Sequence, residues 1–201
     1  MKEMDTLKSE FEKINTTPRV FLEKFYSDVK KHMIDQKISK GRLFNIRPFE
    51  TERFGFKLGK ELNNVPKNKK DVQFWSFNST GDTLLVERIG SNGEIQYSDF
   101  YFYSDSIVRV IGFYDVDSLA FVMDIVFNNG RVTKELSYGK FGSSFSDYNY
   151  NDDMLIDIVV HEREHSQEGY SNHTLLFSYD NGVLSNIVKA YPNGYQEQRY
   201  P

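Results

Sequence analysis

Apolar residues recur at helical spacing at the start of the chain. Residues 4–14 carry an apolar side chain at every third or fourth position with charged residues between, and residues 18–33 repeat this pattern. The spacing predicts two amphipathic helices. Thr17 is a good N-cap and Pro18 suits the first helical position, so the second helix is predicted to begin there. Gly41 is a candidate stop. We therefore expect a helical segment over residues 1–41 that covers one face of a sheet; a helix that binds a partner is the alternative.

The pattern then changes to alternation. Between residues 42 and 56, aromatic and aliphatic residues alternate with polar ones, which predicts one or two short strands. Residues 63–70 contain a proline and three lysines and are typical of an exposed loop. From Val72 onward, short apolar and aromatic runs separated by turn residues indicate antiparallel strands. Residues 97–114 are apolar on both faces in places, as expected of a central strand pair.

Four Asn-Gly dipeptides punctuate this region, at residues 92–93, 129–130, 181–182 and 193–194. A two-residue type I′ turn needs a positive φ at both central positions, and Asn followed by Gly tolerates this best. The dipeptides therefore predict β-hairpins. We expect an α+β fold in a single domain, residues 1–201. In this fold a helix or helix pair (1–41) packs on a curved antiparallel β-meander of about seven to nine strands (42–201).

Composition narrows the function classes. The chain has 17 Phe and 13 Tyr, which favour sheets and are frequent at interfaces. Its net charge of −4 argues against a nucleic-acid partner, which would require a basic surface. With no cysteine there is no thiol nucleophile, cysteine-based zinc site or disulfide. No apolar run approaches the ~18 residues of a membrane span, and the first residues lack a signal sequence. The expected location is cytoplasmic, or extracytoplasmic on a membrane anchor if Met1 is not the native start.

One motif suggests catalysis. His161, Glu162 and His165 match the HExxH pattern of zinc peptidases, in which a helix brings both histidines to one metal ion. However, residues 156–160 are rich in β-branched side chains, which prefer a strand. On a strand the two histidines would lie ~13 Å apart along the chain, too far to share one ion. We prefer the strand, and a zinc-dependent hydrolase remains the alternative.

The other candidate motifs lack essential positions. Asp147, Asn149 and Asn151 resemble the start of a calcium loop, but Asp152 stands where that loop needs Gly and Ile158 where it needs Glu. Residues 139–144 lack the Gly-Lys-Ser/Thr order of a phosphate loop. We therefore predict no catalytic, cofactor-binding or metal-binding residues, no cofactor, and a protein that is not an enzyme.

In length, organisation and hairpin style, residues 18–200 resemble the immunity proteins that bacteria pair with polymorphic toxins, most of all the TipC-type partners of LXG toxins. The resemblance implies a non-enzymatic protein that binds its cognate toxin and blocks the active site. It also implies a membrane anchor outside the cytoplasm, which this sequence does not contain. On this hypothesis the toxin-facing surface is formed by an acidic group: Asp147, Asp152, Asp153, Asp157, Glu162 and Glu164.

Overall fold

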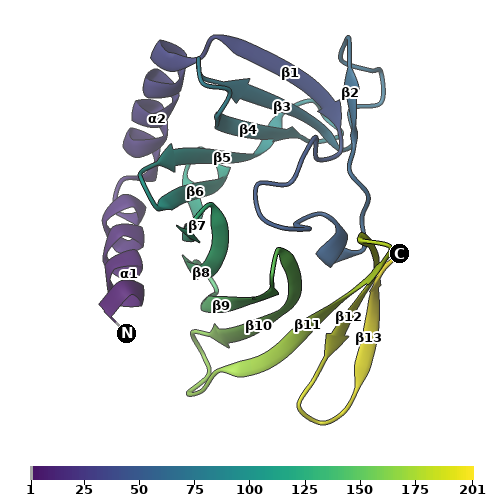
Figure 1. Cartoon of the computed structure of the whole chain (residues 1–201). Helices are drawn as coiled ribbons and strands as arrows, with labels where there is room; N and C mark the ends of the chain where they lie inside the picture. The colour runs from purple at the N-terminus through teal and green to yellow at the C-terminus, as the bar shows by residue number, and fades with distance from the viewer. Residues whose placement is uncertain (1) are drawn as a thin grey trace.

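The computed structural model describes residues 2–201, in which two helices pack on one antiparallel sheet of thirteen strands (Figure 1). The helices are α1 (Lys2–Asn15) and α2 (Pro18–His32), and a short 3₁₀ helix, η1, spans Glu52–Phe54. The first seven strands are β1 (Asp35–Lys40), β2 (Lys60–Leu62), β3 (Val72–Phe77), β4 (Thr83–Ile89), β5 (Ile95–Tyr103), β6 (Ile107–Asp115) and β7 (Ser118–Asn128). The other six are β8 (Arg131–Gly139), β9 (Gly142–Asn151), β10 (Met154–Glu164), β11 (Ser171–Asp180), β12 (Val183–Ala190) and β13 (Gln196–Tyr200).

The α+β class and the helices on one sheet face are confirmed, and α2 begins at Pro18 as predicted. Three finer predictions are wrong. The sheet has thirteen strands rather than seven to nine. The helical segment ends at His32, and residues 35–40 form β1, because this stretch pairs along its whole length with β3. Residues 42–56 form no strand; they contain only η1, because their apolar side chains pack on the sheet instead of alternating within it.

Strands follow one another across the sheet in chain order from β3 to β13, and only β1 and β2 are added out of order beyond β3. Two of the connections are two-residue turns with positive φ at both positions. Asn129 and Gly130 have φ of 50° and 77° between β7 and β8, and Asn181 and Gly182 have 50° and 79° between β11 and β12. Asparagine and glycine tolerate this left-handed backbone best.

The sheet is strongly curved (Figure 1). It buries apolar side chains on both faces. On the convex face, Leu7, Phe11 and Ile14 of α1 and Phe25 of α2 pack on β4–β8. The concave face holds the second core, which extends from Trp75 on β3 to Ile187 on β12. No helix of residues 2–201 combines the length and apolar character that crossing a bilayer requires.

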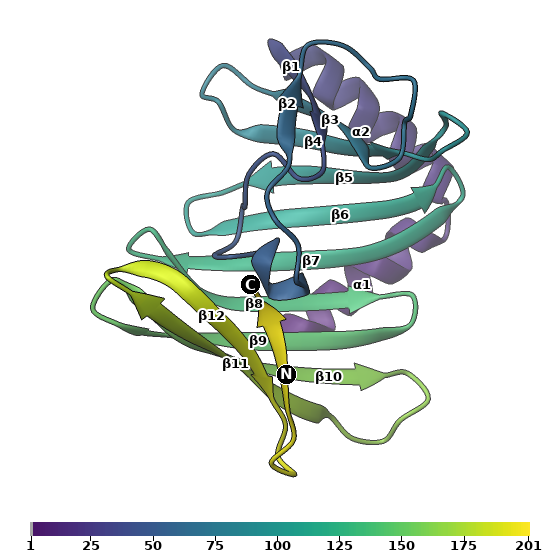
Figure 2. The same cartoon turned by 90° about the vertical axis from the view of Figure 1, so that its right-hand side faces the viewer.

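Residues 41–59, which we call the inserted segment, leave the sheet after β1 and run inside its concave face (Figures 1 and 2). Phe44 lies against Trp75 with ring centroids 4.7 Å apart, and Phe49 lies 5.5 Å from Phe177. Its 3₁₀ helix reaches the C-terminal strand β13, where the backbone at Gly55 approaches the Arg199 carbonyl. The segment therefore spans the opening of the curved sheet and forms one wall of the cavity described next.

Candidate functional site

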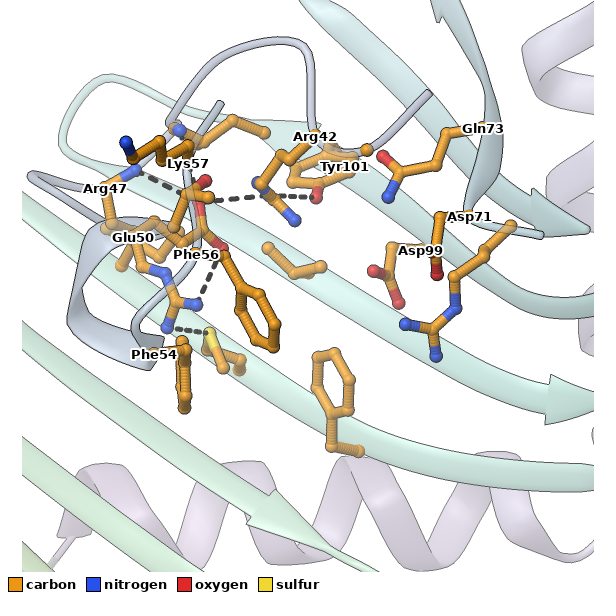
Figure 3. A pocket seen from close by; sticks show the side chains of 18 of the residues that line it. Arg42, Arg47, Glu50, Phe54, Phe56, Lys57, Asp71, Gln73, Asp99 and Tyr101 are labelled. Atoms are coloured by element: carbon orange, nitrogen blue, oxygen red, sulfur yellow. Dashed lines mark hydrogen bonds and ion pairs between the residues drawn. The ribbon is translucent and has the colours of Figure 1, made fainter. Parts of the chain in front are cut away.

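A cavity of about 580 Å³ lies between the inserted segment and the concave face of β3–β7 (Figure 3). Its floor is apolar and comes from the middle of the sheet: Val110, Phe121, Met123 and Ile125. Five cationic side chains line it: Lys40, Arg42, Arg47, Lys57 and Arg88. Three acidic side chains also line it: Glu50, Asp71 and Asp99. A volume of this size with a few polar groups above an apolar floor is typical of a ligand site.

Buried ion pairs fasten the inserted segment to the sheet. Arg47 donates to Glu50 at 2.7 Å and to Glu135 of β8 at 2.5 Å. Arg42 contacts the other oxygen of Glu50 at 3.0 Å. Arg53 of η1 donates to the Tyr148 hydroxyl, which in turn donates to Glu135. Arg42, Arg47, Glu50 and Glu135 each meet an opposite charge, and Arg53 is linked to Glu135 through the Tyr148 hydroxyl, so the network can remain buried.

The arginines of this network also lower the pKa values of its two glutamates. Burial alone would raise the pKa of Glu50, but the neighbouring charges of Arg47 and Arg42 outweigh it and lower that pKa to about 2. The pKa of Glu135 is likewise lowered, because Arg47 and Arg53 more than offset its burial. Both carboxyl groups are therefore ionised at neutral pH, and the inserted segment is a fixed wall of the cavity.

Asp99 on β5 behaves differently. Burial raises its pKa to about 6, against the opposing influence of Arg42 and Arg88. Its carboxylate makes no hydrogen bond and no ion pair within 4.0 Å among residues 2–201. Beside it, Gly112 of β6 lacks a side chain; a Cβ there would lie 2.9 Å from Asp99 Oδ1 and 2.4 Å from the Phe121 ring. The glycine therefore leaves the carboxylate open to the cavity.

Two further polar atoms of the lining are buried without a hydrogen-bond partner in the part of the chain that the structure describes. They are Gln73 Oε1, an acceptor, and Arg42 Nε, a donor. Buried polar groups in proteins are nearly always hydrogen-bonded, so each exception calls for a physical reason. Both atoms are closed off from the cavity as the side chains stand, so a ligand reaches them only after a neighbouring side chain moves.

The rim of the cavity is apolar and exposed. Phe54 and Phe56 expose 63% and 66% of their surface, and Leu58 exposes 44%. All three belong to the inserted segment, and both phenylalanines line the cavity. Large apolar side chains that cluster on a well-anchored segment are typical of an interaction site.

The structure places the predicted acidic residues on more than one surface. Asp147 pairs across the strands with Lys134, which bonds to Glu3 of α1, so Asp147 lies on the convex face. Asp157 accepts a hydrogen bond from Asn149 on that same face. Glu162 and Glu164 alternate to the concave side, where Glu162 lies 3.8 Å from His173. Asp152 and Asp153 form the β9–β10 turn, and Asp153 pairs with Arg131. The six residues therefore do not form a single patch.

The HExxH residues lie on and just after a strand, as preferred from the sequence. Residues 154–164 form β10, where His161 stacks on Phe145 with ring centroids 4.3 Å apart. His165 follows the strand, and its Nε2 lies 2.9 Å from the Gly139 carbonyl oxygen. Among residues 2–201, no three His, Cys, Asp or Glu side chains are grouped as a metal site would require. The motif therefore lacks the helical geometry that zinc peptidases use.

Sequence reasoning missed the residues that build the cavity: Arg42, Arg47, Glu50, Gln73 and Asp99. The only signal was three arginines and two glutamates within the alternating phenylalanines of residues 42–54. That signal became informative once the segment was seen inside the sheet. No protein-family model matches the chain, and no curated protein matches it either.

Proposed function

We propose that the protein is a non-enzymatic immunity protein that binds a bacterial toxin and blocks its active site. The observation that carries this proposal is the exposed apolar rim, Phe54, Phe56 and Leu58, on a segment held by buried ion pairs. Aromatic side chains at such positions supply much of the affinity at protein interfaces. Because the segment is already fixed to the sheet, ordering it on binding costs little.

The acidic residues enter the proposal as modulators of association. Charges at the edge of an interface mostly steer the encounter and contribute little to the final affinity. Glu162 and Glu164 share the concave side with the rim, whereas Asp147 and Asp157 lie on the convex face. Reversal of the first pair should slow association, and reversal of the second pair should not.

The test begins with a search of the neighbouring genes for a toxin, followed by a calorimetric titration of the protein against that toxin domain. Phe56→Ser should weaken binding by about 30-fold, which corresponds to the roughly 2 kcal/mol of an interface hot spot. Phe141→Ser is the matched control, since Phe141 is 68% exposed but lies in the β8–β9 turn. Equal loss in the two variants, or a folded protein that neither binds the toxin nor protects cells expressing it, would refute the proposal.

A further inference from the structure

The polar groups of the cavity are unevenly arranged along it, and the proposed toxin contact at the rim leaves this arrangement unexplained. Figure 3 shows Asp71, Gln73 and Asp99 at one end, with Arg47, Glu50 and Lys57 at the other. The phenyl ring of Phe56 lies between the two ends. The acceptors Asp99 and Gln73 therefore lie apart from the Lys57 ammonium group, although Arg88 acts on Asp99 at one end and Glu50 lies at the other.

The acceptor end is preorganised and unsatisfied. The Asp99 carboxylate and the buried Gln73 Oε1 have no partner within the described residues. Asp71 is held in a left-handed backbone conformation, φ 61°, and its carbonyl oxygen accepts a hydrogen bond from the Gly41 amide at 2.7 Å. An ammonium or guanidinium group has several donors and a positive charge, so it complements these oxygens.

At the other end of the cavity, most cationic groups are already paired with carboxylates. Arg47 is fully committed to Glu50 and Glu135. Arg42 uses its Nη2 on Glu50 and Tyr101, which leaves the buried Nε without a partner among residues 2–201. Lys57 forms no ion pair within that same part of the chain. The ammonium group of Lys57 is therefore available to an anion, whereas Arg42 Nε is enclosed and Arg42 contributes its positive charge.

We infer that this cavity binds a zwitterionic ligand, whose cationic group meets Asp99 and Gln73 and whose anionic group meets Arg42 and Lys57. An apolar or aromatic stem joins the two groups and lies on the floor formed by Val110, Phe121 and Met123. Such a ligand leaves the charge balance of the cavity unchanged. A simple cation would approach the five cationic side chains, and a simple anion would approach the three acidic ones.

The titration of Asp99 fits this assignment. With a pKa of about 6, its half-buried carboxyl is largely ionised at neutral pH. A cationic partner would compensate that charge, so ligand affinity should fall as the pH drops below about 6. The charged groups around Asp99 come from four parts of the chain: Lys40, Asp71, Arg88, and the Arg42–Glu50–Arg47 group of the inserted segment.

The experiment uses ε-aminohexanoate and para-aminomethylbenzoate as probes, titrated into the full-length protein by calorimetry. Hexylammonium and hexanoate are the controls that carry one charge each. Both zwitterions should bind at least about tenfold more tightly than either control, since each charge-assisted hydrogen bond contributes roughly 1.5–3 kcal/mol. Equal affinity for zwitterions and singly charged analogues, or no binding at all, would overturn the inference.

Variants locate the site. Asp99→Asn keeps the shape of the side chain, and it should weaken zwitterion binding about tenfold or more. Lys57→Met should weaken it from the anionic side, and this exposed position should leave the fold intact. Asp147→Asn on the convex face is the matched control and should bind normally. Unchanged affinity in both Asp99→Asn and Lys57→Met would place the probe elsewhere and refute the assignment.

The inference does not depend on a toxin, so its failure can be told apart from failure of the proposed function. The cationic and anionic groups that occupy the cavity can come from two sources. One is a free zwitterion, and the other is a basic and an acidic side chain of a bound partner. The toxin titration repeated with saturating aminohexanoate distinguishes them. Weakened toxin binding identifies partner side chains as the occupant, and unchanged binding identifies a separate small-molecule site; both outcomes support the inference.

Discussion

Asp99→Asn should stabilise the protein at neutral pH. The folded-state pKa of Asp99 is about 6, against an ordinary value of 3.8. Each unit of difference corresponds to about 1.4 kcal/mol, so the half-buried carboxylate costs at most about 3 kcal/mol once it is ionised. Because the pKa is raised in the folded state, the contribution of Asp99 to the free energy of unfolding is fully present below about pH 4. That contribution is lost as the pH rises through about 6. The asparagine variant has no such loss.

Several other groups also change the stability with pH, and two of them, His173 and Glu50, have large pKa shifts. Burial, reinforced by nearby Lys189 and Arg199, lowers the pKa of His173 to about 4, so stability rises as the pH increases from about 4 toward its ordinary value of 6.5. The lowered pKa of Glu50 gives stability that is present above 4.5 and is lost as the pH falls toward 2. Both act equally in the wild type and the variant, so the difference between the two proteins isolates Asp99.

Urea unfolding of both proteins at several pH values measures that difference. The variant should gain at most about 1.5 kcal/mol at pH 5 and at most about 3 kcal/mol at pH 8. Asp147→Asn controls for the loss of one exposed negative charge. A gain that is the same at both pH values would refute the reasoning, because it would mean that Asp99 titrates alike in the folded and unfolded chains.

Three further predictions concern the framework. Glu135→Gln should lower the free energy of unfolding by roughly 3 kcal/mol in urea titrations, since it removes one partner of the buried Arg47. Phe11→Ala should cost roughly 3–5 kcal/mol by the same assay, because it empties the contact between α1 and the sheet. Metal analysis after incubation with zinc should give the same content for wild type and His161→Ala; stoichiometric zinc that is lost in the variant would restore the hydrolase alternative.

The fold could be predicted where local chemistry and tertiary packing agree. Thr17 and Pro18 mark the start of α2, and the β-branched residues before His161 indicate β10. Prediction failed where tertiary contacts determine the secondary structure. Residues 35–40 follow a helix without a clear break, yet they become a strand because β3 offers a partner along their whole length. The polar strand β13 lacks the apolar alternation by which strands are counted.

The cavity could not be predicted, because its parts are distant in sequence. Arg47 looks like an exposed arginine until it meets Glu135, and Gly112 is one glycine among thirteen until Asp99 and Phe121 lie on either side of it. The unsatisfied atoms Gln73 Oε1 and Arg42 Nε have no sequence signature, because only the completed fold of residues 2–201 shows that they are buried without a hydrogen-bond partner.

The order of the sheet also bears on how the chain folds during synthesis. From β3 to β13 every strand pairs with its neighbour in sequence, so the sheet can grow strand by strand as the chain emerges, and such local pairing favours fast folding. The inserted segment cannot follow this order. Arg47 can pair with Glu135 only after 88 more residues have been synthesised, and Arg53 can bond to Tyr148 only after 95 more. We expect the sheet to form first and the wall of the cavity to close last, so nascent chains shorter than β9 would expose an unfilled concave face.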